Sequence, residues 1–239
     1  MAKRDPSGIS SNGINRVDLG QESWSTDEID AIVKPQTQWD PEKYFNIWVV
    51  KFTGNNLLGY AQFPNASGLS GITPNEGPAN TDGVVIGYAF FGSSSYFPGG
   101  TYGTDYDKGR TASHEVGHWL GLRHIWGDDA GCDIDDFCAD TPNAGDKNEG
   151  CPTGVDSCPT SPELDMIENY MDYTNDACMN IFTADQKTRM TTVMNNSTRR
   201  VSLKTSDALV PGVTFANDAS TMIVTLNINC SSNFLPVIK

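Results

Sequence analysis

Three histidines, one glutamate and one glycine lie close together in the sequence, in a spacing that suits a metal site. His114, Glu115 and His118 form the pattern HExxH, which places two histidines on one face of a helix, where both reach the same ion. Gly121 and His124 extend the pattern to HExxHxxGxxH, because glycine lets the chain turn sharply out of the helix and return a third histidine. Three nitrogen ligands leave one zinc coordination position open for water.

Chance and ordinary core packing explain this arrangement poorly. The chain has 3 histidines, and all of them lie in the pattern. Histidines scattered at random would take this spacing in roughly 1 of 10,000 arrangements, so satisfied core histidines are a weak alternative. A zinc ion lowers the pKa of a bound water to about 7, and Glu115 is placed to accept its proton and pass it to the leaving amine of a peptide bond. The pattern predicts one catalytic zinc ion, with Glu115 as the general base.

A second motif, NYMDY at residues 169–173, resembles the methionine turn of the metzincin clan of metallopeptidases. In that clan the turn lies beneath the three-histidine site, and Met171 matches its methionine. Tyr173 matches the tyrosine that in several families hydrogen-bonds near the metal and helps to stabilise the tetrahedral intermediate. A methionine alone is more often a core residue, so the pairing with Tyr173 supports the resemblance.

Within the clan, the sequence is most similar to the pappalysin family, over roughly residues 14–198. The matching segments are 46–50, 58–64, 109–127, 140–142 and 168–173, together with Asp176 and Cys178. The resemblance implies an α+β, metzincin-like catalytic domain. An upper mixed sheet and the active-site helix would stand above an irregular, disulfide-bridged lower subdomain.

The resemblance also implies a preference for basic substrates. In part of the family, an aspartate five residues after the turn methionine lies at the base of the S1′ pocket and selects a basic side chain. Asp176 holds that position here. A buried carboxylate forms a bidentate pair with a guanidinium, so we expect cleavage before Arg, and before Lys. The alternative is a solvated loop aspartate.

Acidic residues crowd the region that follows the zinc motif. The carboxylates between positions 128 and 149 are Asp128, Asp129, Asp133, Asp135, Asp136, Asp140, Asp146 and Glu149. So many carboxylates do not order closely without cations, and the resemblance implies one or two structural calcium ions. No EF-hand spacing is present, so the ligand set is not derivable. The candidate ligands are Asp133, Asp135, Asp136 and the carbonyl of Thr141, and the alternative is a solvated acidic loop.

The 6 cysteines favour disulfides, and hence an oxidising compartment and a secreted protein. A cysteine zinc cluster is less favoured because no CxxC pair exists. Six cysteines alone allow about fifteen pairings. Family spacing implies the pairs Cys132–Cys158 and Cys151–Cys178 and leaves Cys138 and Cys230 unassigned. Other members carry a pro-segment that blocks the zinc through a cysteine, and nothing upstream of residue 14 resembles one.

The overall charge limits the classes of partner. The 16 basic and 30 acidic residues give a formal net charge of -14, which repels nucleic acid and anionic membrane surfaces. No apolar run is long enough to cross a bilayer. We therefore expect protein or peptide substrates, no nucleic acid, no membrane insertion and a monomer.

Several helices and strands are expected to position these residues. A short helix begins at Ser25 or Thr26 and is expected to end at Pro35. Segments 44–52, 58–63 and 83–91 are rich in aromatic and β-branched residues and predict strands of one twisted sheet. If segment 58–63 forms the sheet edge above the zinc, it could bind an extended substrate by strand addition. Helices are expected from residue 109 to about 122 and, after an N-cap at Thr183, to about Met194.

Three regions follow from these elements. Residues 1–13 are expected to form an N-terminal arm. Residues 14–204 form the catalytic domain, with an upper subdomain to about 121 and a lower one from about 122. Residues 205–239 are expected to be a linker and the start of a truncated, β-rich C-terminal domain, with strand-like sequence at 212–215 and 222–228. The leading hypothesis is a zinc endopeptidase; the alternatives are a catalytically weak metal-binding or adhesive module, and a narrow processing peptidase targeted by a missing C-terminal domain.

Overall fold

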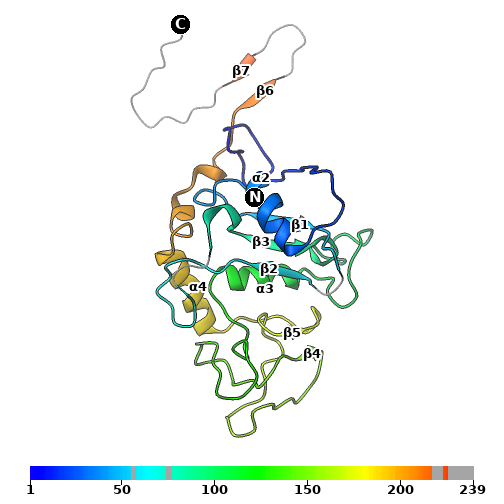
Figure 1. Cartoon of the computed structure of the whole chain (residues 1–239), viewed down its shortest axis with the longest axis vertical. Coiled ribbons are helices and arrows are strands. Elements are labelled where there is room, and N and C mark those ends of the chain that lie inside the picture. The colour runs from blue at the N-terminus through cyan, green and yellow to red at the C-terminus, as the bar shows by residue number, and fades with distance from the viewer. Residues whose placement is uncertain (55–56, 74–76, 217–222, 226–239) are drawn as a thin grey trace. The chain divides into compact units, whose positions relative to one another are not determined.

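The computed structural model describes residues 1–54, 57–73, 77–216 and 223–225 (Figure 1). The chain divides into two compact units. The larger is Val17–Thr205, and the smaller combines Met1–Arg16 with Ser206–Lys239. The larger unit spans most of the predicted catalytic domain and is called the catalytic unit after that prediction. No helix in the described ranges is long and apolar enough to span a bilayer.

A three-stranded mixed sheet forms the upper part of the catalytic unit. Its strands are β1 (Ile47–Val50), β2 (Gly59–Ala61) and β3 (Val84–Gly87), in the order β1-β3-β2. β1 runs parallel to β3, and β2 runs antiparallel to it. The strands are shorter than the sequence predicted. The third strand ends at Gly87, because Tyr88–Phe90 forms a 3-10 helix (η3). A second 3-10 helix, η2 (Ala79–Thr81), precedes β3.

The first helix continues through the proline that was expected to end it. It comprises α1 (Thr26–Glu28), a π turn η1 (Ile29–Val33) and α2 (Lys34–Thr37). Proline lacks the N–H that closes an α-helical turn and collides with the preceding turn. The π turn widens the helix just before Pro35, since Lys34 N–H donates to the carbonyl of Ile29. The prediction that Pro35 ends the helix is therefore wrong.

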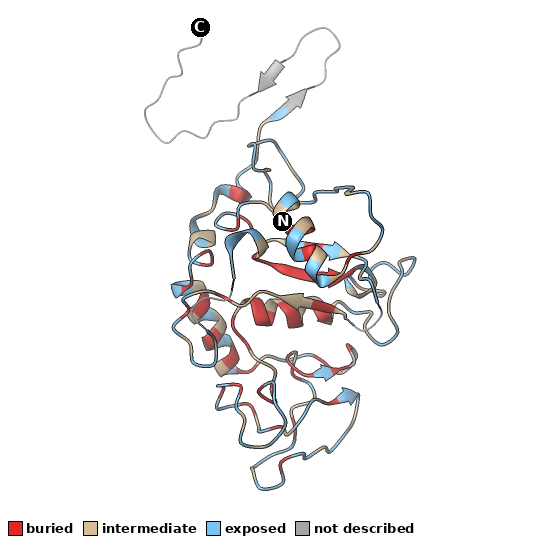
Figure 2. Cartoon of the chain, viewed as in Figure 1, coloured by how far each residue is buried: buried red, intermediate tan, exposed pale blue. Residues whose placement is uncertain are grey.

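The sheet is covered on both faces, as alternating side chains require. Val85 and Trp48 pack on one face against the first helix, at Ile29 and Val33. Val84 and Ile86 pack on the other face against Trp119 of α3 (Arg110–Trp119). In Figure 1, α3 runs directly beneath the sheet, and Figure 2 shows that β3 and most of α3 are buried. The sheet thus fixes the helix that carries the HExxH motif.

The lower part of the catalytic unit is mostly irregular, as predicted. Its strands, β4 (Glu149–Gly150) and β5 (Tyr173–Thr174), are short and pair in parallel. A small core of Leu122, Ile125, Trp126, Ala144 and Met171 lies between this region and α4 (Ala184–Asn196). The N-cap Thr183 and Gln186 form a capping box that begins α4, and the 3-10 helix η4 (Ser202–Thr205) follows.

The smaller unit pairs the N-terminal residues with the segment after the catalytic unit. Lys3 N–H donates to Ala208 O, and Ser10 N–H donates to Val213 O. This unit contains the 3-10 helix η5 (Asp207–Leu209) and an antiparallel pair, β6 (Thr214–Ala216) and β7 (Ile223–Thr225). The predicted strand at 222–228 lies partly outside the described residues, and Cys230 lies outside them. The three-region division drawn from the sequence stays a prediction.

Candidate metal centre

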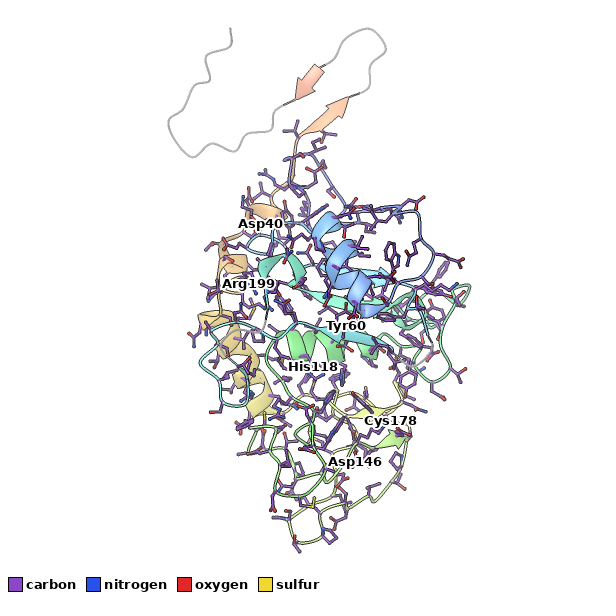
Figure 3. All side chains as sticks on the ribbon, viewed as in Figure 1. Asp40, Tyr60, His118, Asp146, Cys178 and Arg199 are labelled. Carbon is purple, nitrogen blue, oxygen red and sulfur yellow. A yellow bond between two sulfur atoms is a disulfide. The ribbon has the colours of Figure 1, made fainter. Side chains whose placement is uncertain are left out.

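Helix α3 places two histidines one turn apart, and a third side chain meets them. His118 lies on α3, above the lower segments that carry Cys178 and Asp146 (Figure 3). The Nε2 atoms of His114 and His118 are 3.0 Å apart. Nε2 of His124 is 3.2 Å from that of His114 and 3.1 Å from that of His118. Zn–N bonds of about 2.0 Å in a tetrahedron place nitrogens roughly 3.3 Å apart, so these three atoms converge as zinc ligands do.

A turn at Gly121 returns the third histidine to the site. Gly121 has a φ of 87°, in the left-handed region that favours glycine. A Cβ atom at this position would lie 2.8 Å from Cγ2 of Val193 on α4. Leu122 N–H donates to the carbonyl of Gly117 at 2.9 Å and closes the turn. Backbone conformation and close packing therefore both require a glycine before His124.

The imidazole rings point Nε2 to the centre because each Nδ1 is hydrogen-bonded elsewhere. Taken in chain order, the acceptors for the three histidines are the carbonyl of Tyr170 at 2.7 Å, the carbonyl of Leu122 at 2.8 Å and the carboxylate of Asp128. Oxygens of this kind accept, so each Nδ1 carries a proton and each Nε2 offers its lone pair. This is the arrangement expected of imidazole metal ligands.

The charge state of the histidines also suits a cation. Burial lowers the pKa of His118 to about 3 and that of His114 well below its ordinary value, so both rings are neutral. Elsewhere in the described ranges, no group of three His, Cys, Asp or Glu side chains brings its ligand atoms within 4.8 Å of one another. Three imidazole nitrogens that converge on one point fit a zinc ion.

Glu115 lies between the sheet and the metal centre. Only 6% of its surface is exposed, and burial raises its pKa to about 8. A cation at the neighbouring histidines would favour the ionised form. A Cβ atom on Gly59 would lie 2.9 Å from Oε1 of Glu115 and 2.8 Å from its Cγ. The glycine of β2 thus lets the sheet edge pass directly over this carboxylate.

Met171 lies beneath the histidines and is fully buried. A Cβ atom on Gly117 of α3 would lie 2.4 Å from the Met171 sulfur, so the helix and the methionine turn approach as closely as the glycine permits. The same turn supplies the Tyr170 carbonyl that orients His114. Asn169 Oδ1 accepts from Met171 N–H at 2.9 Å and fixes the turn. The methionine turn therefore both supports the helix and orients one ligand.

Tyr173 stands beside two of the histidines. Its ring centroid is 4.9 Å from that of His124 and 5.7 Å from that of His114, and 39% of its surface is exposed. The buried carboxylate of Asp172 accepts from Tyr173 N–H at 2.8 Å and from Asn148 N–H at 2.8 Å. This contact ties β5 to the irregular region. A phenol at the rim of the site can donate to a bound peptide carbonyl.

Asp176 is buried against the start of α3. Its Oδ2 accepts from the backbone N–H groups of Lys108 at 2.7 Å and Arg110 at 3.2 Å. Gly109, the N-cap residue of α3, has no side chain to do this. Oδ1 of Asp176 is buried and has no hydrogen-bond partner among the described residues, and burial raises the pKa of the carboxyl. One oxygen therefore caps the helix, and the other is available to accept a hydrogen bond.

The candidate calcium ligands do not converge as the histidines do. Asp135 and Asp136 accept from the backbone N–H groups of Phe137 and Cys138, at 2.7 and 2.9 Å. Asp136 is 3% exposed, its second oxygen and the hydroxyl of Thr141 are both buried, and the hydroxyl interacts with the carboxyl of Asp136 and favours its ionised form. Asp133 is not brought into a group of three carboxylates with them. The cluster remains a candidate.

Two disulfides cross-link the irregular region. The bridges join Cys132 to Cys158 and Cys151 to Cys178, with Cα atoms 5.6 and 5.9 Å apart, and these are the pairs that the resemblance implied. Cys138 is buried and has no disulfide partner among the described residues. Burial raises the pKa of its thiol to about 12, so it is a poor nucleophile.

Some residues at the site were missed in the sequence. Gly59 and Gly117 matter because backbone or side chains approach them closely, and a glycine carries no signal of that in a single sequence. Trp126 stacks on His124 with ring centroids 4.3 Å apart and ring planes 6° apart. Asp128 was counted only with the acidic residues. Its position four residues after a metal histidine was the one available signal.

A family model described as pregnancy-associated plasma protein-A, that of the pappalysins, matches residues 27–195. An extracellular metalloprotease of Sordaria macrospora is 40% identical over 174 residues, which cover 72% of this chain and 56% of that protein. Extracellular metalloprotease 1 of Coccidioides posadasii is 39% identical over 172 residues, with the same coverage of both chains. The chain thus spans about half the length of these curated relatives.

Solved structures of mirolysin from Tannerella forsythia share this fold. Mature mirolysin in complex with a cleaved peptide aligns with a TM-score of 0.73 and 44% identity, over 87% of this chain and 74% of that one. A promirolysin mutant aligns with a TM-score of 0.71 and 43% identity, over 87% of this chain and 65% of that one. These likenesses confirm the predicted metzincin-like α+β architecture. By the family model and by these relatives, the chain belongs to the pappalysin family of metallopeptidases.

Proposed function

We propose that this chain is a zinc-dependent endopeptidase with Glu115 as its general base. The observation that carries the proposal is the convergence of three histidine Nε2 atoms within 3.2 Å of one another, with Glu115 on the same helix beside them. A zinc ion bound there would supply Lewis acidity to activate a water molecule and to polarise the scissile carbonyl. His114, His118 and His124 would hold it, with the fourth position open.

The remaining roles fall to side chains around this centre. Glu115 accepts the proton of the attacking water and transfers it to the leaving amine. Its position under Gly59 leaves only 6% of its surface exposed, which limits proton exchange with bulk water. Tyr173 donates a hydrogen bond to the carbonyl oxygen as negative charge develops there. Asn148 and Asp172 hold the backbone that presents this phenol.

The outer edge of β2 offers a binding site for an extended peptide. In the described part of the chain, β2 pairs on one side only, with β3. Leu58 O accepts from Gly87 N–H, and Gln62 N–H donates to Gly83 O, so these alternate residues face β3. The backbone N–H and C=O groups of Gly59 and Ala61 then point away from β3. A substrate that adds to this edge would pass over Glu115, and such main-chain pairing tolerates many sequences.

Cleavage itself is the test of this proposal. A peptide library is incubated with the chain and with Glu115→Ala, and the new termini are sequenced. We expect the unsubstituted chain to cleave peptides and Glu115→Ala to leave them intact. Equal cutting by both proteins would contradict the mechanism, and peptide binding without any cutting would favour the metal-binding module.

We further propose that Asp176 selects Arg, and Lys, at P1′. The support is its buried Oδ1, which is free to accept from a guanidinium or ammonium group, and its position beside the start of the active-site helix. A charge-assisted contact with a substrate cation would favour that substrate. Because Oδ2 also caps α3, removal of the whole carboxyl would disturb the helix as well as the pocket.

Asp176→Asn is expected to lower the preference for Arg over an uncharged residue at P1′ by about 10- to 100-fold. Asparagine keeps an acceptor oxygen for the backbone of Lys108 and Arg110 but loses the charge that pairs with the substrate. The measurement is kcat/KM for two matched peptides, with zinc content determined in parallel. Asp156→Asn, which neutralises an exposed aspartate, is the control. An unchanged preference in Asp176→Asn would place specificity elsewhere.

We also propose structural calcium in the acidic region, with Asp136 as a ligand. The support is a buried carboxylate whose second oxygen is shielded from solvent and lies close to Thr141, the residue whose carbonyl is another candidate ligand. Burial raises its pKa to about 7, above the value of about 4 in an unfolded chain. The folded state therefore holds a proton that the unfolded state releases, and this stabilisation is lost as pH rises from about 4 through 7. A bound cation would compensate the carboxylate at higher pH.

Calcium is expected to raise the Tm of the chain at pH 8 and to have a smaller effect on Asp136→Asn. The amide cannot supply the negative charge that the ion requires. Tm is measured by calorimetry at fixed zinc concentration, with and without calcium. An equal gain in both proteins would remove Asp136 from the ligand set.

Finally, we propose that the protein is secreted. Its two disulfides persist in an oxidising compartment, and the curated relatives are named extracellular metalloproteases.

A further inference from the structure

The third histidine is oriented differently from the other two. His114 and His118 donate through Nδ1 to neutral backbone carbonyls, whereas Nδ1 of His124 meets the carboxylate of Asp128, four residues later in the chain. An anionic acceptor holds an imidazole more firmly than a carbonyl and makes its other nitrogen a stronger donor to a metal. His124 also lies outside the helix that fixes the other two, so its orientation depends on local contacts.

The backbone aims Asp128 at His124 through a tight turn. Gly127 and Asp128 both adopt left-handed conformations, with φ of 72° and 71°. Such a conformation costs free energy in a residue other than glycine, and it persists where the surroundings hold it. Gly127 N–H donates to His124 O at 2.9 Å. A Cβ atom on Gly127 would lie 2.4 Å from Ile134 Cγ2, so the acidic region packs directly against this turn.

Arg123 holds the second oxygen of the same carboxylate. Its Nε donates to Asp128 Oδ2 at 2.8 Å, and its Nη2 donates to the carbonyl of Gly127. Asp128 thus uses one oxygen for His124 and the other for Arg123. Its side chain is 34% exposed, and that of Arg123 is 23% exposed. An ordinary surface ion pair would not need the strained turn or the contact with a metal-site imidazole.

From this geometry we propose that Asp128, clamped by Arg123, is a positioning residue that orients His124 and strengthens its bond to the metal. The proposal rests on the proposed zinc site but not on peptide cleavage. The carboxylate also places one negative charge beside a centre that is proposed to hold a cation. Loss of this contact should leave His114 and His118 in place and loosen the third ligand alone.

The test is the affinity of the chain for zinc. The metal is removed, and the zinc dissociation constant is measured by competition with a chromogenic chelator for the unsubstituted chain, Asp128→Ala and Asp128→Asn. Loss of an outer partner of this kind weakens metal binding by about 10- to 100-fold, and we expect that range for Asp128→Ala. Asp128→Asn keeps an acceptor oxygen for His124, so its zinc affinity should lie between that of the unsubstituted chain and that of Asp128→Ala. The absorption spectrum of the Co²⁺-loaded proteins should shift in the same order.

Asp129→Ala is the matched control, because it removes a neighbouring exposed aspartate whose Oδ1 accepts from the backbone N–H of the next residue. We expect its zinc affinity to be unchanged. Circular dichroism shows whether each variant is folded. If Asp128→Ala does not fold, the comparison is made with Asp128→Asn. The proposal is overturned if the folded Asp128 variants bind zinc as tightly as the unsubstituted chain or as Asp129→Ala. A chain that binds zinc tightly but cuts no peptide would contradict the proposed function and leave this inference standing.

Discussion

Glu115→Gln is expected to lower kcat for peptide hydrolysis by about 10²- to 10⁴-fold while the zinc content stays the same. Glutamine has nearly the same shape as glutamate, so it fills the space under Gly59 without disturbing β2. It cannot accept a proton at neutral pH, and the water then attacks without a general base. The substitution thus separates metal binding, which is proposed for the histidines, from proton transfer, which is proposed for Glu115.

The measurement is kcat and KM on one peptide that the library experiment selects, with zinc measured in the same samples. KM should change little, because only 6% of the Glu115 surface is exposed and glutamine has nearly the same shape. Glu42→Gln, at an exposed position, controls for loss of a negative charge. Dialysis against a chelator should abolish cutting by the unsubstituted chain, and zinc should restore it. A Glu115→Gln protein with undiminished kcat would rule out the general-base role.

The zinc site was readable in the sequence because its geometry is local. One helical turn separates His114 from His118, and one left-handed glycine returns His124, so spacing alone brings the nitrogens together. The methionine turn is distant in sequence, and only the resemblance linked it to the histidines. The structure gives the physical reason, since Gly117 of α3 leaves room for the Met171 sulfur.

Other features depend on partners that spacing does not reveal. The sequence indicated strands but not their ends, because β3 stops where Tyr88–Phe90 turns into a 3-10 helix. Pro35 was expected to end a helix, and a π turn accommodates it instead. The capping role of Asp176 involves backbone far away in the sequence, at Lys108 and Arg110. Such long-range polar contacts have no periodic signature.

A buried ion cluster, also unpredicted, anchors the end of the active-site helix. Asp82 is 1% exposed, and its Oδ1 accepts from Nε1 of Trp119, the last residue of α3, at 3.1 Å. Its Oδ2 accepts from Arg199 and, at 2.7 Å, from Arg200. The fully buried guanidinium of Arg200 lies 3.7 Å from the ring centroid of Trp119. One carboxylate thus joins the sheet, α3 and the segment after α4.

Asp82→Ala is expected to lower the free energy of unfolding by about 3–5 kcal/mol, because it leaves two buried guanidinium groups without their counter-charge. Asp82→Asn keeps an acceptor for Trp119 and should cost less. Urea denaturation of the zinc-loaded chain measures the change. Glu22→Ala, which removes an exposed ion pair with Lys51, should leave the urea midpoint nearly unaltered. Equal midpoints for Asp82→Ala and Glu22→Ala would show that the cluster does not stabilise the fold. Since Trp119 follows His118 directly, a destabilised cluster should also speed zinc loss, which links the stability of the sheet to the integrity of the metal centre.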